Sequence, residues 1–197
     1  MPRVFVACHD PSRHGKVTWE GYDIVGYVDQ HPGTSVGDAP YFKGWDSIPA
    51  SFHGTIDIVL SMYCPVALTL RTGEVTSFAE PPASKTDAHA SDTYEIVTKG
   101  FELLKPGGFF LFPRLQNVPP EVLTALEKTL PPGTNTARIV AVPKPRWIRH
   151  RQDDRYDVNE DYSIDVLPSL QITKGVSGGR RRRTTRRSRR RKMTRRR

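Results

Sequence analysis

The segment FELLKPGGFFLF, residues 101–112, contains the local pattern on which the interpretation of the fold depends. Its first half ends a helix whose apolar side chains repeat at helical spacing: Tyr94, Val97, Phe101 and Leu104. Pro106 cannot continue that helix, and Gly107-Gly108 permits a tight turn. The apolar run that follows is typical of a short strand. The segment therefore predicts a helix, a turn and a strand in succession.

The rest of the sequence alternates in the same way between apolar runs and helical patterns. Strands are predicted at 3–8, 23–28, 55–64, 109–115 and 137–142, with a weaker one at 162–167. Helices are predicted at 93–104 and 118–133, and any helix within 9–21 should be short. The polar segments 79–92 and 143–161 are predicted to be irregular. This order predicts an α/β fold with a single doubly wound, mostly parallel sheet.

Charge divides the chain into a body and a tail. The last 18 residues hold 13 of the 30 basic residues and no acid, and the whole chain has a formal charge of +9. The other residues hold 17 basic side chains against 21 acids, so the body is mildly acidic. We expect an α/β domain at 1–174, a Gly-rich hinge at 175–179 and an Arg-rich, disordered C-terminal tail at 180–197.

The two cysteines, Cys8 and Cys64, give no disulfide framework and fit a reducing compartment. We therefore expect both thiols to be reduced and partly buried. The N-terminal apolar run is too short for a signal peptide, and no run approaches the ~18 residues of a membrane span. We expect an intracellular protein without a membrane partner, and the sequence does not indicate its oligomeric state.

Ligands of open α/β sheets bind outside the carboxyl ends of the central strands. Four groups should therefore share one rim: Cys8, Asp29, Asp46 and Ser61–Cys64. Cys8 and Cys64 follow strands that should be neighbours, about 4.8 Å apart, so their Cα atoms are expected within about 10 Å.

Three stretches resemble class I, Rossmann-like methyltransferases that use S-adenosylmethionine. They are VGYVDQHP (25–32), GWDSIPASFHGTIDIVLS (44–61) and ELLKPGGFFLF (102–112), in that order. The resemblance implies that Asp29 holds the ribose hydroxyls of the cofactor and that Asp46 lies beside the adenine. On physical grounds alone, an acid at a strand end can accept hydrogen bonds from a ribose, or it can begin a turn with His31-Pro32-Gly33.

The first turn departs from that family. Where the family has Gly-x-Gly-x-Gly, this chain has Ala7, His9 and Pro11. The glycines let the backbone turn tightly and let the cofactor lie against it, whereas histidine adds a ring and proline removes an N–H. The candidate cofactor-binding residues are Ala7, Cys8, His9, Asp29 and Asp46. S-adenosylmethionine is the expected cofactor if the protein is active, and none is expected otherwise.

The stretch SMYCPV, 61–66, stands where amino-methylating relatives carry Asn/Asp-Pro-Pro-aromatic. Its candidate catalytic residues are Ser61, Tyr63 and Cys64. Cys64 is either a nucleophile for pyrimidine C5 chemistry or a buried cysteine at a strand end.

Two further groups have alternative interpretations. Cys8, His9 and His14 could bind zinc together with Cys64, but the spacing of known zinc motifs is missing, so no metal is predicted. The segment 146–151 is either a nucleic-acid contact with an aromatic residue, or an exposed loop balanced by the acids at 153 and 154.

The tail is predicted to bind nucleic acid without sequence preference, because it neutralises phosphates and releases counterions. Arginine adds bidentate phosphate contacts and stacking. The residues concerned are Arg180, Arg181, Arg182, Arg183, Arg186, Arg187, Arg189, Arg190, Arg191, Lys192, Arg195, Arg196 and Arg197. A nuclear-import signal is a second use of the same residues.

Gly-Gly followed by a basic tail also resembles proteins packaged in the particles of large DNA viruses, which implies a viral protein in a virion or nucleus. Two functions are therefore expected. One is a methyltransferase-like protein, active or inactive, held on nucleic acid by its tail. The alternative is a non-catalytic nucleic-acid-binding virion or structural protein that keeps the fold without the cofactor.

Overall fold

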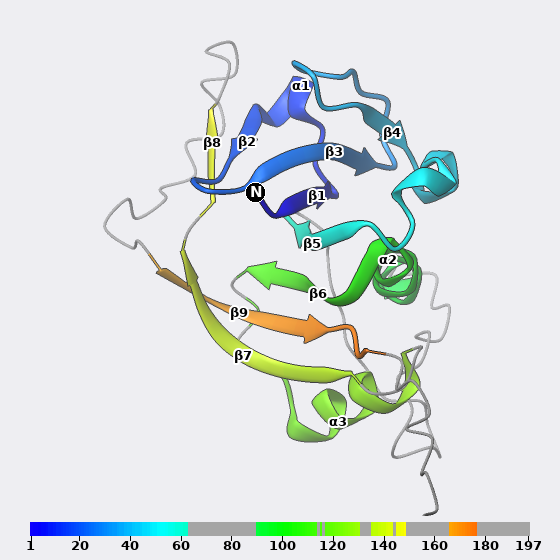
Figure 1. The fold of residues 1–197 in the computed structure, drawn as a ribbon, viewed down its shortest axis with the longest axis vertical. Helices are drawn as coiled ribbons and strands as arrows, with labels where there is room; N and C mark the ends of the chain where they lie inside the picture. Colours follow the sequence, from blue (N-terminus) through cyan, green and yellow to red (C-terminus); the bar gives the residue numbers. More distant parts are fainter. Residues whose placement is uncertain are drawn as a thin grey trace, which may run out of the picture.

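The computed structural model describes residues 1–62, 90–113, 115, 117–130, 135–143, 145–148 and 166–176. Within these residues the chain forms an α/β fold around one seven-stranded sheet with the order β4-β3-β1-β5-β6-β9-β7 (Figure 1). The strands are β1 (Arg3–Ala7), β3 (Asp23–Asp29), β4 (Tyr41–Lys43), β5 (Ile56–Ser61), β6 (Leu104–Pro113), β7 (Thr136–Pro143) and β9 (Val166–Thr173). The pairs from β4 to β6 are parallel, and β9 is antiparallel to both its neighbours. The prediction of a mostly parallel α/β sheet is confirmed.

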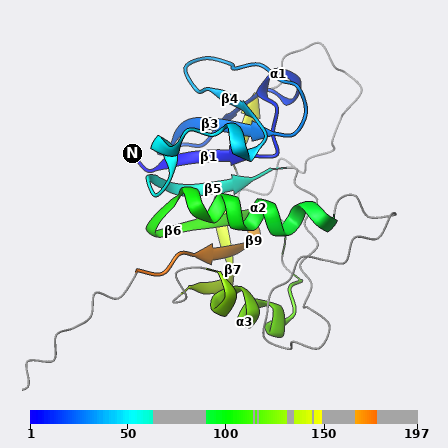
Figure 2. The ribbon, with the colours of Figure 1, turned by 90° about the vertical axis from the view of Figure 1, so that its right-hand side faces the viewer.

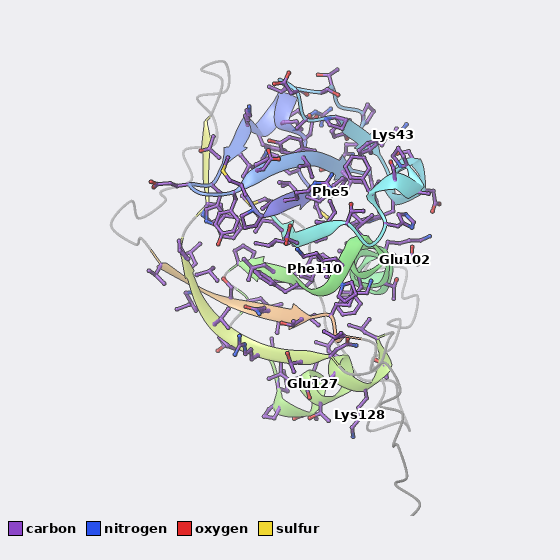
Figure 3. The ribbon with its side chains drawn as sticks, in the orientation of Figure 1. Phe5, Lys43, Glu102, Phe110, Glu127 and Lys128 are labelled. Carbon is purple, nitrogen blue, oxygen red and sulfur yellow. The ribbon has the colours of Figure 1, made fainter. Side chains whose placement is uncertain are left out.

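The helices agree with the predicted ones to within a few residues. They are α1 (Pro11–His14), α2 (Ala90–Leu103) and α3 (Pro120–Thr129), with 3-10 turns η1 (Trp45–Ser47) and η2 (Ala50–Phe52) between β4 and β5. Figure 2 shows α2 and α3 in front of the sheet. Both helices contribute to a single apolar cluster that contains Leu170 as well as Phe5 and Phe110, which Figure 3 labels.

The opposite face of the sheet carries a second apolar cluster, because side chains alternate along each strand. Val4 and Val6 of β1 belong to it, whereas Phe5 and Ala7 face the helices. Val17 and Trp19, which lie in and after β2 (Lys16–Thr18), pack on this second face. Strand β2 pairs with β8 (Arg146–Ile148) in a separate two-stranded sheet (Figure 1).

The structure corrects two predicted boundaries. The segment 143–161 was predicted to be irregular, but part of it is β8, which exists because β2 supplies its partner. The weak strand predicted at 162–167 begins later, at Val166, and continues to Thr173. Pro168 precedes Ser169, the first residue of β9 that pairs with β6, so its missing N–H breaks no bond to β6. The predicted hinge and tail lie outside the described residues, except for Gly175 and Val176.

The turn in FELLKPGGFFLF is an outward bulge inside β6. Leu104 pairs with Ile56 and Phe109 with Ile58, so the residues between them loop out of the ladder. Gly107 has φ +82°, which favours glycine, and a Cβ on Gly108 would lie 2.9 Å from the carbonyl oxygens of Ile56 and Asp57. The two glycines are therefore required for different reasons, one for backbone conformation and one for space.

Gly108→Ala is expected to lower the free energy of unfolding by about 2 kcal/mol, because the atoms that the methyl group meets are backbone and cannot rotate away. Gly107→Asn should cost less than 1 kcal/mol, since asparagine tolerates the left-handed conformation. Urea unfolding of both variants measures the difference. Equal stability of Gly108→Ala and the parent chain would contradict this close packing.

Candidate functional site at the carboxyl ends of β1, β3 and β5

The carboxyl ends of three adjacent parallel strands meet at one rim, as the sequence predicts. The His9 N–H donates to the Val28 carbonyl (3.3 Å), and the Met62 N–H donates to the Ala7 carbonyl (3.1 Å). Ala7 is paired with Ser61, which is buried. Cys8, Asp29 and Ser61 therefore stand at neighbouring strand ends, while Tyr63 and Cys64 lie outside the described residues.

The first turn is held by a carboxylate in place of glycines. Cys8 has φ 55°, a left-handed conformation that is uncommon for a residue with a side chain. Asp10 caps α1, accepting hydrogen bonds from the Ser12 N–H (2.9 Å) and hydroxyl (2.6 Å), and Pro11 begins the helix. Arg13 Nε lies 3.4 Å from the other oxygen of Asp10. An Asp-Pro pair before a short helix is a recognisable sequence signal for this cap.

His9 is packed inside the body. Its side chain is fully buried, and Nε2 donates to the Gly15 carbonyl at 2.7 Å. The ring lies 5.7 Å from the rings of Tyr27 and His14, and the Tyr27 hydroxyl accepts from the Val17 N–H. Burial, with a smaller effect of the nearby His14, lowers the pKa of His9 to about 4, against the opposing effects of the Gly15 hydrogen bond and of Asp10 and Asp29. His9 is therefore a neutral part of the core at pH 7.

Asp29 begins a turn. Its Oδ1 accepts the His31 N–H at 3.0 Å, and its backbone carbonyl accepts the Gly44 N–H at 2.7 Å. The first of these bonds is the one expected from the turn interpretation, and the second carboxylate oxygen is still available to accept a hydrogen bond from a ligand.

The loop after Asp29 folds back over the first turn. A Cβ on Gly33 would lie 2.7 Å from both Asp10 Oδ1 and the Tyr41 ring, so this loop is in close contact with the Asp10 carboxylate. The Tyr41 hydroxyl donates to the His31 carbonyl. Burial, together with the negative charges of Asp29 and Asp10, raises the pKa of Tyr41 to about 12, against the opposing effect of Arg13. Neither Gly33 nor Tyr41 is indicated as a site residue by any local sequence pattern.

Asp46 lies in a different group of side chains from Cys8 and Asp29. Its exposed carboxylate is 3.2 Å from Lys99 of α2. Both line a pocket of about 130 Å³, whose other lining residues are Trp45, Ile48, His53, Glu102 and Leu103. His53 and Glu102 precede the starts of β5 and β6, so the pocket extends toward the opposite end of the sheet. The expectation that Asp46 joins the rim therefore finds no support in these contacts.

The prediction of reduced thiols is wrong for Cys8. Cys8 is half-buried, as expected, but it is disulfide-bonded, and no cysteine within the described part of the chain is free. The strand order from which Cys8 and Cys64 were expected to lie close together is confirmed, since β1 and β5 are parallel neighbours. The sequence contains one other cysteine, Cys64, which lies outside the described residues. The small number of cysteines suggested a reducing compartment, and the disulfide at Cys8 removes that inference.

The residues that the structure describes contain no cluster of three or more potential metal ligands. In the same part of the chain, no helix is both long and apolar enough to cross a membrane. Comparison of the sequence with models of known protein families and with curated proteins found no match.

The depressed pKa of His9 predicts a loss of stability in acid. The unfolded chain takes up a proton near pH 6.5, whereas the folded chain does so only near pH 4. The contribution is therefore complete above pH 6.5 and falls by about 3 kcal/mol as the pH drops to 4. Guanidinium unfolding across this range should show a smaller decline in His9→Gln than in the parent chain, and identical pH profiles would contradict a neutral buried His9.

The disulfide predicts the thiol content of the chain. When the protein is unfolded without reductant, a thiol-reactive dye should find no free thiol, and after reduction it should find both cysteines. Reduction should lower the free energy of unfolding by about 2–4 kcal/mol, because the cross-link restricts the unfolded chain. Two reactive thiols before reduction would restore the original prediction.

Proposed function

We propose that the protein is a non-catalytic nucleic-acid-binding protein, with a methyltransferase-like body and an Arg-rich tail that holds it on nucleic acid. The first turn carries the argument against catalysis. His9 and Asp10 are buried there and bonded to the chain itself, and Gly33 closes over the Asp10 carboxylate. A cofactor that used this turn would have to displace packed and hydrogen-bonded groups.

The strand order supports the methyltransferase-like part of the proposal. Six strands of the large sheet run in the same direction: β1, β3, β4, β5, β6 and β7. Numbered one to six along the chain, they have the order 3-2-1-4-5-6 across the sheet. Doubly wound sheets have this order, with the switch point beside the first strand. The antiparallel β9 beside the last strand also fits the fold of class I methyltransferases, which the sequence resembles.

The nucleic-acid part of the proposal is based on the tail. Thirteen basic residues and no acid within 18 residues make a polyanion the natural partner, and the mildly acidic body would otherwise repel one. The resemblance to packaged viral proteins makes a virion our proposed location.

Deletion of residues 178–197 is expected to abolish most binding to DNA or RNA while the body stays folded. The full chain should show a log–log salt slope of several units, at about 0.9 per phosphate contact on duplex DNA. Fluorescence anisotropy against salt concentration measures both quantities, and circular dichroism checks the fold. A truncated chain that binds as well as the full one would contradict a role for the tail.

The enzyme remains the second candidate, because Asp29 stands at the end of β3 with one carboxylate oxygen available to a ribose. Calorimetry with S-adenosylmethionine separates the two functions. We expect no heat of binding at millimolar ligand, since the first turn is occupied by the chain. Micromolar binding that is lost in Asp29→Ala but kept in Asp38→Ala, an exposed control, would establish the enzyme instead.

A further inference from the structure

Strand β7 forms one border of the large sheet and has a neighbouring strand on one side. It pairs with β9 along its whole length, and in the part of the chain that the structure describes no strand pairs with its outer side. Figure 1 shows α3 beside the end where β7 begins, while the rest of the strand runs away from that helix. We call the outer side of residues 139–143 the open edge.

The direction of the backbone groups of β7 follows from one hydrogen bond. The Ala137 N–H donates to Glu127 Oε1 of α3 at 2.9 Å, so it points away from β9. Backbone groups alternate in direction along a paired strand, so the N–H and C=O groups of Ile139 and Ala141 point outward as well. Pro143 adds an outward C=O without an N–H. Glu127 therefore covers the start of the outer side, and within the described residues no hydrogen bond reaches the open edge.

An exposed apolar patch adjoins the open edge. Among the strands that the structure describes, only β7 and β9 expose large apolar side chains, with Ile139 38% and Val166 48% accessible. The register places Pro143 opposite Val166 and Ala141 opposite Pro168, so all five side chains lie on one face of the sheet. The three smaller side chains are exposed too. The patch contains no charged side chain.

The opposite border of the sheet is protected, in contrast to the open edge. Strand β4 has three residues and ends at Lys43, and the Tyr41 N–H donates to the Ser35 hydroxyl at 2.9 Å. Short edge strands and lysines oppose pairing with a further strand. Strand β7 has eight residues with an uninterrupted register, and its one charged residue is Arg138. It therefore keeps the properties of a strand that accepts a partner.

We propose that the open edge binds the open edge of a second copy of this chain, in an antiparallel pair that continues the sheet across a two-fold axis. A second copy offers the same outward groups, so a single contact satisfies both edges. A two-fold contact also closes, which limits the assembly to two chains. The inference uses the body alone and does not depend on the proposed function.

Pro143 determines the register of this pair. With the axis at Val140, Ile139 of each copy faces Ala141 of the partner subunit, and each of these two facing pairs exchanges two hydrogen bonds. A register that brought Ile139 opposite Pro143 would leave the Ile139 C=O without a donor. In the Val140 register the large Ile139 side chain also packs beside the small Ala141 of the partner subunit, which covers part of the apolar patch.

Charge does not oppose this pair. In the Val140 register, Arg138 lies opposite Val142 of the partner subunit, so the two Arg138 side chains are four residues apart along the sheet, about 13 Å. That separation exceeds the Debye length of about 8 Å at physiological salt. Four hydrogen bonds and a small patch are less than a tight dimer uses, so we expect a dissociation constant in the micromolar range.

The test measures the mass of the full chain by sedimentation velocity as its concentration rises, in about 0.5 M salt so that nucleic acid held by the tail is released. The parent chain should change from monomer to dimer. Ala141→Pro removes an outward N–H and leaves the bonds to β9 in place, so the dimer should dissociate about ten-fold more readily. Ala141→Ser, the matched control, keeps the N–H and should dimerise like the parent chain.

A second pair of variants applies if Ala141→Pro unfolds, which circular dichroism detects. Ile139→Lys places a charge on the open edge and should also weaken the dimer about ten-fold or more. Its control is Val176→Lys, which changes an exposed apolar residue beyond the far end of β9 and should have no effect.

Three results would overturn the proposal. They are a parent chain that stays monomeric up to about 200 µM, well above the micromolar range expected for so small an interface, open-ended oligomers in place of a dimer, and folded edge variants that dimerise as tightly as their controls. Binding to nucleic acid does not enter this measurement. A failed dimer therefore leaves the proposed function standing, and loss of the proposed function leaves the dimer standing.

Discussion

The burial of β1 on both faces and both edges is the constraint on which the rest of the structure depends. Val4, Phe5, Val6 and Ala7 are completely inaccessible, and the strand is hydrogen-bonded to β3 on one side and β5 on the other. A strand in this position must end in a turn whose polar groups are satisfied locally, because water cannot reach its last residues. The chain meets this demand through the backbone bonds of His9 and Met62 and through the Asp10 cap.

That solution competes with ligand binding. In a nucleotide-binding sheet, the turn after the first strand leaves its N–H groups open to the ligand. Here the Asp10 carboxylate takes up the N–H of Ser12, and the imidazole of His9 fills space beside Tyr27. Each group stabilises the body and closes part of the rim. The same residues that make the fold stable without a ligand therefore occupy the turn that a ligand would use in a nucleotide-binding sheet.

Most of the fold could be predicted from local patterns, whereas much of the candidate site could not. The runs that became β1 and β5 are continuous and apolar, and FELLKPGGFFLF contains both the end of α2 and the start of β6. Strand β8 was missed because the three residues after Pro145 acquire their conformation from β2, which is remote in the sequence. Asp46 follows β4, a strand that was not predicted, and η1 directs its side chain toward Lys99; no residue pattern encodes that direction. The disulfide at Cys8 was missed because cysteine number indicates the compartment only on average.

The position of β9 determines how the body responds when its end is pulled. Strand β9 lies between β6 and β7 and is paired with both, and Lys174 and Gly175 add side-chain and backbone bonds to Leu104, Gly108 and Asn135. A force applied through the C-terminus acts along this strand and loads its two ladders in shear, so that many hydrogen bonds bear the load together. An edge strand in the same place would peel away one bond at a time. The order of the strands thus gives the body mechanical resistance where the chain leaves β9.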